Sequence, residues 1–136
     1  MGRQFECRLR VRSYEVDSFG RVNNAVFLNY LEAARGDYLI QAGLSFDQFE
    51  SWQAYPVVRH ARLSFRAPLR AEDEIRILGE MLPLRRTGVR TIQQIRRVPN
   101  DEIVLEAEIE LVFLDRAGKP IAVPEEFRRR LVEGGG

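Results

Sequence analysis

The amino-acid sequence predicts an α+β fold in which one antiparallel sheet packs against one long helix. One long segment, residues 24–42, is apolar on nearly every side. Because the apolar face of a sheet must pack against another layer, we expect the strands to wrap around this helix. Five segments alternate apolar and polar side chains, as strands with one buried face do: residues 5–13, 57–67, 74–81, 89–98 and 103–114.

The composition favours a single globular domain over residues 1–136. One Cys and one His exclude an internal disulfide, a Cys- or His-rich zinc site and a mechanism with two imidazoles. With 21 basic and 20 acidic residues, the formal net charge is +1, which gives no general attraction to nucleic acid or to an anionic membrane. We therefore expect chemistry based on carboxylates, hydroxyls, arginines or backbone amides, without a metal or cofactor.

The N-terminal residues predict a cytoplasmic location. The chain is charged from Arg3 onward and has no apolar stretch of the kind found in secretory signals. Its longest uncharged segment, residues 22–31, contains three Asn and is far shorter than the roughly 20 apolar residues that span a bilayer.

The first predicted strand separates its side chains into two rows. The polar row contains Glu6, Arg8, Arg10 and Arg12, and the apolar row contains Phe5, Cys7, Leu9 and Val11. Because Cys7 stands in the apolar row with no His or helix start beside it in the sequence, we expect a buried and unreactive thiol.

Residues 24–42 are predicted to form a buried helix that stops at Gly43. The apolar residues leave almost no wholly polar face, and a helix that is apolar all round is usually buried. A few polar side chains lie in its middle. Among them, Glu32 and Arg35 are spaced to form an i,i+3 ion pair.

Turn residues and charges predict how the later strands are connected. A loop carrying Trp52 and Pro56 leads into the second strand, and the Pro-Asn-Asp-Glu sequence at residues 99–102 predicts a hairpin turn. In that hairpin we expect Arg90 and Arg96 to form cross-strand charge pairs with the glutamates of the last strand.

The C-terminal residues predict a short helix over about residues 124–132. Pro124 and two acids come first and the bases of Arg128–Arg130 come last, which is the order that the helix dipole favours. Acids elsewhere balance these bases, and no aromatic residues are interleaved with them, so we do not expect nucleic-acid binding.

The loop at residues 14–25 has the features of an acyl-transfer site without Ser or His. Two acids precede a glycine, and two Asn stand where the helix begins. The first turn of a helix presents unpaired N–H groups that bind anions. If Asp17 faces this terminus, a carbonyl carbon between them would meet a carboxylate on one side and oxyanion-stabilising amides on the other. The alternative is an ordinary turn in which these side chains bond to nearby backbone.

The same residues carry a family resemblance. Residues 14–35 read YEVDSFGRVNNAVFLNYLEAAR, which resembles the signature of the hot-dog-fold acyl-CoA thioesterases of the 4-hydroxybenzoyl-CoA thioesterase type. Downstream, residues 65–69 followed by Asp73 and Glu74 resemble the next strand and turn of that family. The fold that the resemblance implies is a five-stranded antiparallel sheet around one long central helix, in agreement with the alternation pattern.

Position by position, the resemblance implies that Asp17 is the catalytic carboxylate, as nucleophile or as general base toward water. It also implies that the helix start supplies the oxyanion site, formed by Asn24, Ala25 and Val26. A thiol with a pKa near 8.5 leaves at neutral pH without a strong general acid, so a thioester suits so sparse a site.

Two positions depart from the family signature. Arg21 stands where the family usually has His, and Glu15 replaces the commoner Asp. The first change removes an imidazole from the mouth of the site and bears on substrate positioning or rate, whereas the second keeps the charge.

The sequence also suggests roles for several arginines, for the single histidine and for a second carboxylate. Coenzyme A carries phosphates, and Arg85 and Arg86 in the turn before the fourth strand, together with Arg96 and Arg97 at the end of that strand, are predicted to bind them, with a solvated charged turn as the alternative. The single histidine, His60, shares a row with polar residues, so we expect it at the surface or in an interface. Glu32 is a second carboxylate candidate, because a related branch of the fold uses a helix acid.

We therefore expect a cytoplasmic acyl-CoA thioesterase. The resemblance implies a homodimer or homotetramer with sites at the subunit interface. The main alternative is a non-hydrolytic module on the same scaffold that binds acyl-CoA or acyl-carrier protein, because a fold does not fix a function. A hot-dog dehydratase is disfavoured, since that chemistry pairs Asp with a His and His60 is poorly placed.

Overall fold

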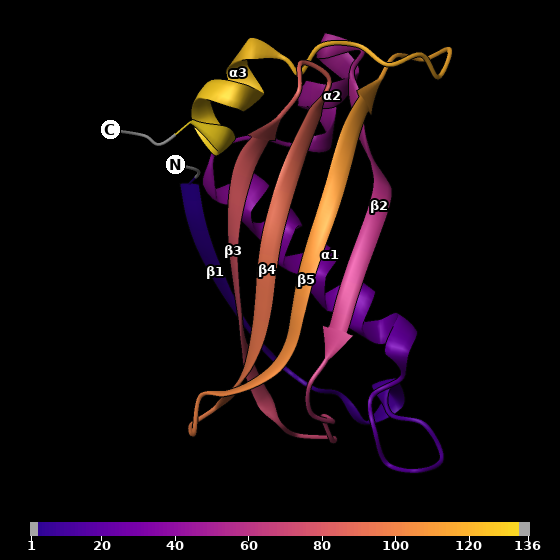
Figure 1. Ribbon diagram of the computed structural model, residues 1–136, viewed down its shortest axis with the longest axis vertical. Helices are drawn as coiled ribbons and strands as arrows, with labels where there is room; N and C mark the ends of the chain where they lie inside the picture. Colours follow the sequence, from indigo (N-terminus) through magenta and orange to yellow (C-terminus); the bar gives the residue numbers. More distant parts are fainter. Residues whose placement is uncertain (1–2, 134–136) are drawn as a thin grey trace.

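The computed structural model describes residues 3–133 and contains a five-stranded antiparallel sheet with a long helix across one face (Figure 1). The strands stand in the order β1-β3-β4-β5-β2. Their bounds are β1 Arg3–Arg10, β2 Tyr55–Phe65, β3 Glu74–Leu84, β4 Gly88–Val98 and β5 Glu102–Leu114. The helical elements are η1 Ser13–Glu15, α1 Asn24–Gln41, α2 Phe46–Trp52, α3 Glu125–Phe127 and η2 Arg128–Val132. The predicted α+β fold, with its five strands and long helix, is confirmed.

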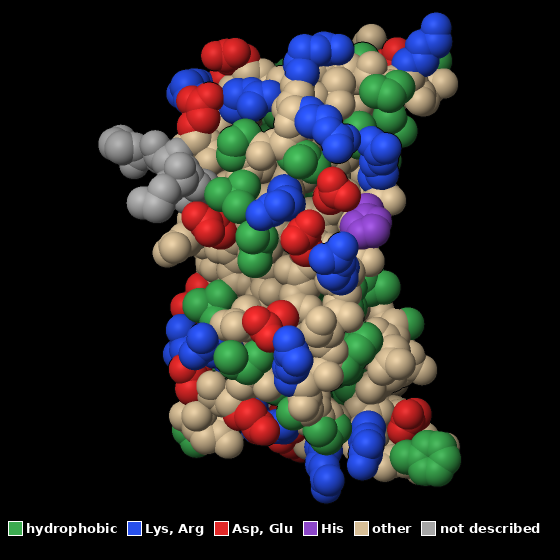
Figure 2. Space-filling model, in the orientation of Figure 1, with side chains coloured by type: hydrophobic (Ala, Val, Ile, Leu, Met, Phe, Trp, Pro, Cys, Tyr) green, Lys and Arg blue, Asp and Glu red, His purple; other side chains and the backbone are tan. Residues whose placement is uncertain are grey.

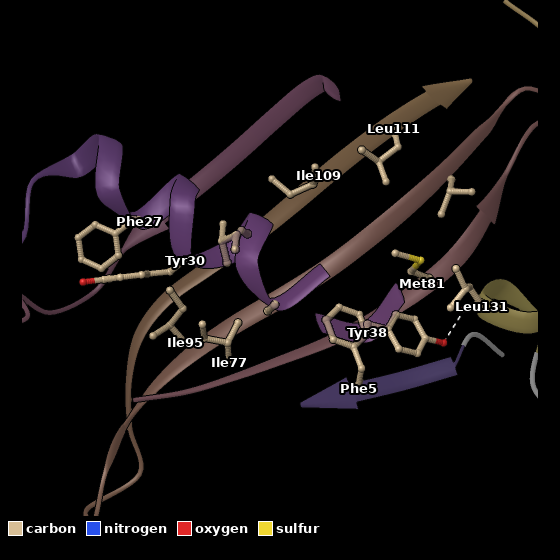
Figure 3. Packing of buried hydrophobic residues seen from close by; sticks show 14 of the residues in the cluster. Phe5, Phe27, Tyr30, Tyr38, Ile77, Met81, Ile95, Ile109, Leu111 and Leu131 are labelled. Atoms are coloured by element: carbon tan, nitrogen blue, oxygen red, sulfur yellow. Dashed lines mark hydrogen bonds between the residues drawn. The ribbon is translucent and has the colours of Figure 1, made fainter. Parts of the chain in front are cut away.

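Alternation along the strands builds the layer of side chains beneath α1. In β3, the isoleucines Ile75 and Ile77 are fully buried and Met81 nearly so, and Ile95 of β4 lies beside Ile77 in register. Figure 3 shows Ile77, Met81 and Ile95 between the sheet and the aromatic residues of α1. Burial of each such side chain contributes about 1.5–3 kcal/mol, so this layer supplies much of the driving force for folding.

A glycine makes room for an aromatic stack near the C-terminal end of α1. Phe5 of β1 lies opposite Gly79 of β3, and a Cβ at Gly79 would collide with the Phe5 ring. The ring stacks on Tyr38 of α1, with centroids 4.5 Å apart. The Tyr38 hydroxyl donates to the carbonyl of Leu131 at 2.9 Å (Figure 3). Sheet, helix and C-terminal segment are thereby joined in one cluster.

Only one face of α1 is buried, so the prediction of burial on all sides is wrong for the single chain. The buried residues include Phe27, Tyr30 and Leu31. On the opposite face Leu28 and Ala33 are exposed, and Ile40 is 72% exposed. The sheet covers one side of the helix, and no element among residues 3–133 covers the other.

Several boundaries differ from the predictions. The first strand ends at Arg10, because Val11 turns to bond with the carbonyl of Asp73. The predicted loop around Trp52 is the short helix α2, which packs Phe49 near Phe113 at a centroid distance of 6.4 Å. Pro56 belongs to β2. None of the helices within residues 3–133 has the length and apolar character of a bilayer span.

The outer face of the sheet carries interspersed acidic and basic side chains (Figure 2). The two predicted cross-strand pairs do not form within residues 3–133. Arg90 stands opposite Glu110 in register without an ion pair, and Arg96 bonds instead to Asp101 at 2.7 Å. A register shift between Ile95 and Arg96 carries Arg96 away from the glutamate row and toward the hairpin turn.

Candidate active site

The loop between β1 and α1 folds into a tight turn that displays Asp17. The backbone N–H of Asp17 donates to the carbonyl of Arg21 at 2.8 Å, and the N–H of Gly20 donates to the carbonyl of Asp17 at 2.9 Å. Gly20 has φ +80°, a conformation that is cheap only for glycine. The turn therefore requires Gly20 and leaves the Asp17 side chain exposed to solvent.

The Asp17 carboxylate is engaged on one of its two oxygens. Oδ1 accepts hydrogen bonds from the N–H groups of Phe19 at 2.9 Å and Arg21 at 3.3 Å. This is the local bonding expected of an Asp in a turn. Within the described chain, Oδ2 has no hydrogen-bond partner, so this oxygen is the one free to meet water or a substrate.

At the start of α1 the three predicted oxyanion donors are not equivalent. Asn23 is the N-cap residue, and its side-chain oxygen accepts from the N–H of Ala25 at 2.8 Å. Its carbonyl accepts from the N–H of Val26 at 2.9 Å. Two of the predicted donors are thus occupied, whereas the N–H of Asn24 has no partner among residues 3–133. One amide of this helix terminus is free for a ligand.

A hydrogen bond that the sequence did not indicate anchors the loop to the helix. The buried Tyr30 hydroxyl donates to Glu15 Oε1 at 2.8 Å, and the N–H of Arg12 donates to the same oxygen at 2.8 Å. Burial and this carboxylate raise the pKa of the Tyr30 hydroxyl. Glu15 and Tyr30 are fifteen positions apart, so no local spacing rule could pair them.

A hollow of about 280 Å³ lies beside Asn24. Its floor includes Phe27 and Phe65, whose rings meet edge to face at 5.4 Å. Two arginines, Arg21 and Arg66, also line it. The hollow thus combines an apolar floor, a cationic rim and a free helix amide, and its volume is just below the usual size range of ligand pockets.

A larger groove of about 730 Å³ runs along the open face of α1. It is bordered by the exposed carboxylate of Glu32, by Gly36 and by the edge strand β2, including Val58. The predicted ion pair between Glu32 and Arg35 does not form among the described residues, because Arg35 faces the sheet. Its guanidinium donates to Gln93 Oε1 at 2.9 Å, and burial lowers the pKa of Arg35.

Of the predicted phosphate-binding arginines, Arg85 and Arg86 lie at the other end of the sheet from Asp17, whereas Arg96 and Arg97 lie near the C-terminal end of β4 and form ion pairs with Asp101 and Asp73. The Asp17 loop packs beside the Glu74 end of β3, whereas Arg85 and Arg86 follow the opposite end of that strand at Leu84. Eleven residues of strand separate these ends by roughly 35 Å. Within one chain the structure does not bring Arg85 and Arg86 to Asp17.

The histidine prediction agrees with the structure. His60 is exposed on the edge strand β2, opposite Glu110. It lies apart from the Asp17 turn and lines neither the hollow nor the groove.

Comparison with known proteins identifies the family. Residues 11–131 match the thioesterase-like superfamily. A chloroplastic acyl-acyl carrier protein thioesterase of Arabidopsis thaliana is 31% identical over 127 residues, which are 93% of this chain and 67% of that protein. The long-chain acyl-CoA thioesterase FadM of Escherichia coli is 29% identical over 127 residues, covering 93% of this chain and 96% of FadM. The chain spans about two thirds of the length of its plant relatives.

A solved structure supports the fold independently. The 1,4-dihydroxy-2-naphthoyl-CoA thioesterase from Synechocystis superposes with a TM-score of 0.88 at 18% identity, over 93% of this chain and 94% of that one. The family match covers nearly all of the described residues, and the fold agrees with it. The chain therefore belongs to the thioesterase-like superfamily, and the hot-dog fold and thioesterase class predicted from its motif are confirmed.

Proposed function

We propose that this thioesterase hydrolyses acyl-CoA to a free acid and coenzyme A at the Asp17 loop. The observation that carries the proposal is the free N–H of Asn24 at the start of an 18-residue helix, beside a hollow and on the same loop as the exposed Asp17. The FadM relative, named as a long-chain acyl-CoA thioesterase, supports this substrate class.

In this proposal the free oxygen of Asp17 does the chemistry. Oδ2 either removes a proton from water or attacks the thioester carbonyl directly, while Oδ1 stays bonded to the turn and fixes the carboxylate. The N–H of Asn24 donates to the oxyanion, and the dipole of α1 adds to its stabilisation. The N–H groups of Ala25 and Val26 hold the helix terminus through Asn23 and so orient the free amide.

We further propose that the active unit is a homodimer or a tetramer of dimers. Among the described residues β2 is an edge strand paired with β5, and its Val57 and Val58 are exposed. Exposed apolar side chains on an edge strand beside an uncovered helix face form a surface that proteins usually cover. A second copy would also be needed to bring Arg85 and Arg86, as phosphate contacts, to an Asp17 loop. Light scattering of the purified protein should give twice or four times the mass of 15.8 kDa.

The cytoplasm remains the expected location of this activity. Acyl-carrier protein is the alternative carrier of the acyl group, and the Arabidopsis relative is named for that substrate.

A thiol-release assay with Asp17→Asn tests the function. Across short, long and aromatic acyl-CoAs, we expect the wild type to release thiol and Asp17→Asn to lose at least about a thousandfold in kcat, as removal of a catalytic base or nucleophile does. Because the Asn side chain still presents an oxygen to Phe19, the melting temperature and acyl-CoA affinity should stay close to those of the wild type. Retention of most of the turnover would contradict the role of Asp17.

A second candidate function is non-hydrolytic binding of acyl thioesters. The observation in its favour is that the Asp17 carboxylate is already bonded to two N–H groups of its own turn. Measurable acyl-CoA binding without thiol release from any substrate would favour this reading.

A further inference from the structure

The rim of the hollow contains one arginine whose charge is uncompensated. Of the two arginines that line it, Arg66 forms an ion pair with Glu106 at 3.0 Å. The guanidinium of Arg21 has no ion pair or hydrogen bond with any of residues 3–133. The hollow therefore has a free cation beside the free amide of Asn24.

The turn fixes the backbone of Arg21 while leaving its side chain free. The N–H of Arg21 donates to Asp17 Oδ1, and its carbonyl accepts from the N–H of Asp17. The residue is thereby held between the carboxylate and the helix start. Substitution of the side chain leaves both of these backbone bonds possible.

We propose that the guanidinium of Arg21 stabilises the oxyanion of the reacting thioester together with the N–H of Asn24. This inference rests on the proposed function. In the base-catalysed form, Asp17 takes a proton from water, the water oxygen bonds to the carbonyl carbon, and the electron pair of the C=O bond moves to its oxygen. When the C=O bond re-forms, the C–S bond breaks, the thiolate leaves, and Asp17 releases its proton to the thiolate or to solvent. With Asp17 as nucleophile, its carboxylate oxygen bonds to the carbonyl carbon and the oxyanion forms on the same carbonyl oxygen. Loss of the thiolate then leaves a mixed anhydride, and water hydrolyses this anhydride to the free acid and the Asp17 carboxylate.

The size of the hollow argues for the oxyanion over a coenzyme phosphate. A sphere of about 280 Å³ is about 8 Å across. The pantetheine arm between the thioester sulfur and the first phosphate spans roughly 15 Å when extended, at about 3.5 Å for every three bonds. If the thioester carbonyl meets Asn24, the phosphates lie outside the hollow. The negative charge that lies near Arg21 in the hollow is therefore the one that develops on the carbonyl oxygen of the thioester.

The experiment compares Arg21→Gln with Arg70→Gln. Arg70 is an exposed arginine at the same end of the molecule that does not line the hollow, so both variants remove one positive charge from this end. Each is assayed on one acyl-CoA and on the same acyl group carried by N-acetylcysteamine, which has no phosphate. We expect Arg21→Gln to lower kcat about a hundred- to thousandfold on both substrates, with little change in KM, and Arg70→Gln to match the wild type.

The pH dependence of kcat in Arg21→His tests whether the side chain at this position acts through its charge. A purely structural role of Arg21 would not make kcat follow the titration of the substituted side chain. Arg stays charged throughout the working range, whereas an imidazole titrates near pH 6.5. We therefore expect kcat of Arg21→His to fall as the pH rises through that value, in a step absent from the wild type and from Arg21→Gln. Arg21→Lys should keep part of the activity at all of these pH values.

The outcomes separate this inference from the proposed function. Turnover by the wild type that is lost in Asp17→Asn but kept in full by Arg21→Gln would overturn only the role of Arg21. A rise in KM confined to the coenzyme A substrate would make Arg21 a phosphate contact and would also overturn the inference. Absence of thiol release from the wild type would overturn both.

Discussion

At its C-terminal end α1 is closed by contacts from β1 and from the C-terminal segment, whereas at its N-terminal end it is left open. The closed end holds the stack of Phe5 on Tyr38, and Arg130 donates to the carbonyl of Ala42 at 3.0 Å. The open end holds the exposed Asp17 and the N–H of Asn24, which has no partner within residues 3–133. Figure 3 shows both ends, with Phe27 and Tyr30 at one and Tyr38 at the other.

The difference indicates that stability and chemistry are separated along a single helix. Backbone groups that are satisfied by the protein contribute to folding, whereas a free N–H at a helix terminus is available to a ligand. Changes at the closed end should therefore alter stability alone. Changes at the open end should alter turnover, and substitutions of the exposed Asp17 and Arg21 side chains should do so with little effect on stability.

Gly79→Ala should give the largest loss of stability. The added methyl would collide with the Phe5 ring, so this ring, which stacks on Tyr38, would have to shift. Overpacking of this kind costs about 1–3 kcal/mol, measurable by urea unfolding. kcat at 25 °C should be unchanged, and a large fall in kcat in a folded variant would break the separation of the two ends.

A compensating variant tests the cause of that loss. Phe5→Leu in the Gly79→Ala background should recover part of the stability, because the smaller side chain leaves room for the methyl group. A double-mutant cycle measures this coupling directly. Simple additivity of the two changes would show that the collision is not the cause.

Removing one hydroxyl at each end gives a matched pair of variants. Tyr38→Phe loses the hydrogen bond to the carbonyl of Leu131, and Tyr30→Phe loses the hydrogen bond to Glu15. Each should lower the free energy of unfolding by about 1–2 kcal/mol. Only Tyr30→Phe should also lower kcat, because Glu15 ties the Asp17 loop to the helix. Equal kcat values in the two variants would show that this anchor does not matter for turnover.

The closed end was largely predictable from the sequence, except for what covers α1. Alternation placed Phe5 inward, and the glycine at position 43 marked the end of the helix to within two residues. The apolar residues of α1 indicated burial on all sides, yet Ile40 is exposed. The apolar pattern of a helix shows which side chains favour burial. It does not show whether the surface that buries them belongs to the same chain.

At the open end, the sequence indicated the residue types but not their bonding. The Asn pair predicted a helix start, and Asn23 is its N-cap. Which of the three predicted amides stays free depends on the Asn23 side chain and carbonyl, which take up two of them. The inward turn of Arg35 toward Gln93 joins positions 58 apart, and only the folded sheet brings those positions together.

The smallest predicted effect concerns β1, which supplies Phe5 to the closed end and, on its outer face, Glu6 to a surface ion pair. Glu6 bonds to Arg76 at 3.1 Å, and this hydrogen bond and charge hold the pKa of Glu6 below its ordinary value. A carboxyl whose pKa is lowered by folding stabilises the protein above its unfolded pKa, and that stabilisation is lost as the pH falls through the folded value.

Glu6→Gln should therefore leave stability slightly lower at pH 7 and reduce its further loss in acid, as measured by urea unfolding between pH 3 and pH 7. Because exposed pairs contribute little and are screened by salt, the difference should shrink in 1 M NaCl. If Glu6→Gln lowered the free energy of unfolding at pH 7 as much as Gly79→Ala does, the closed end would be stabilised by the outer face of β1 as well as by its aromatic stack.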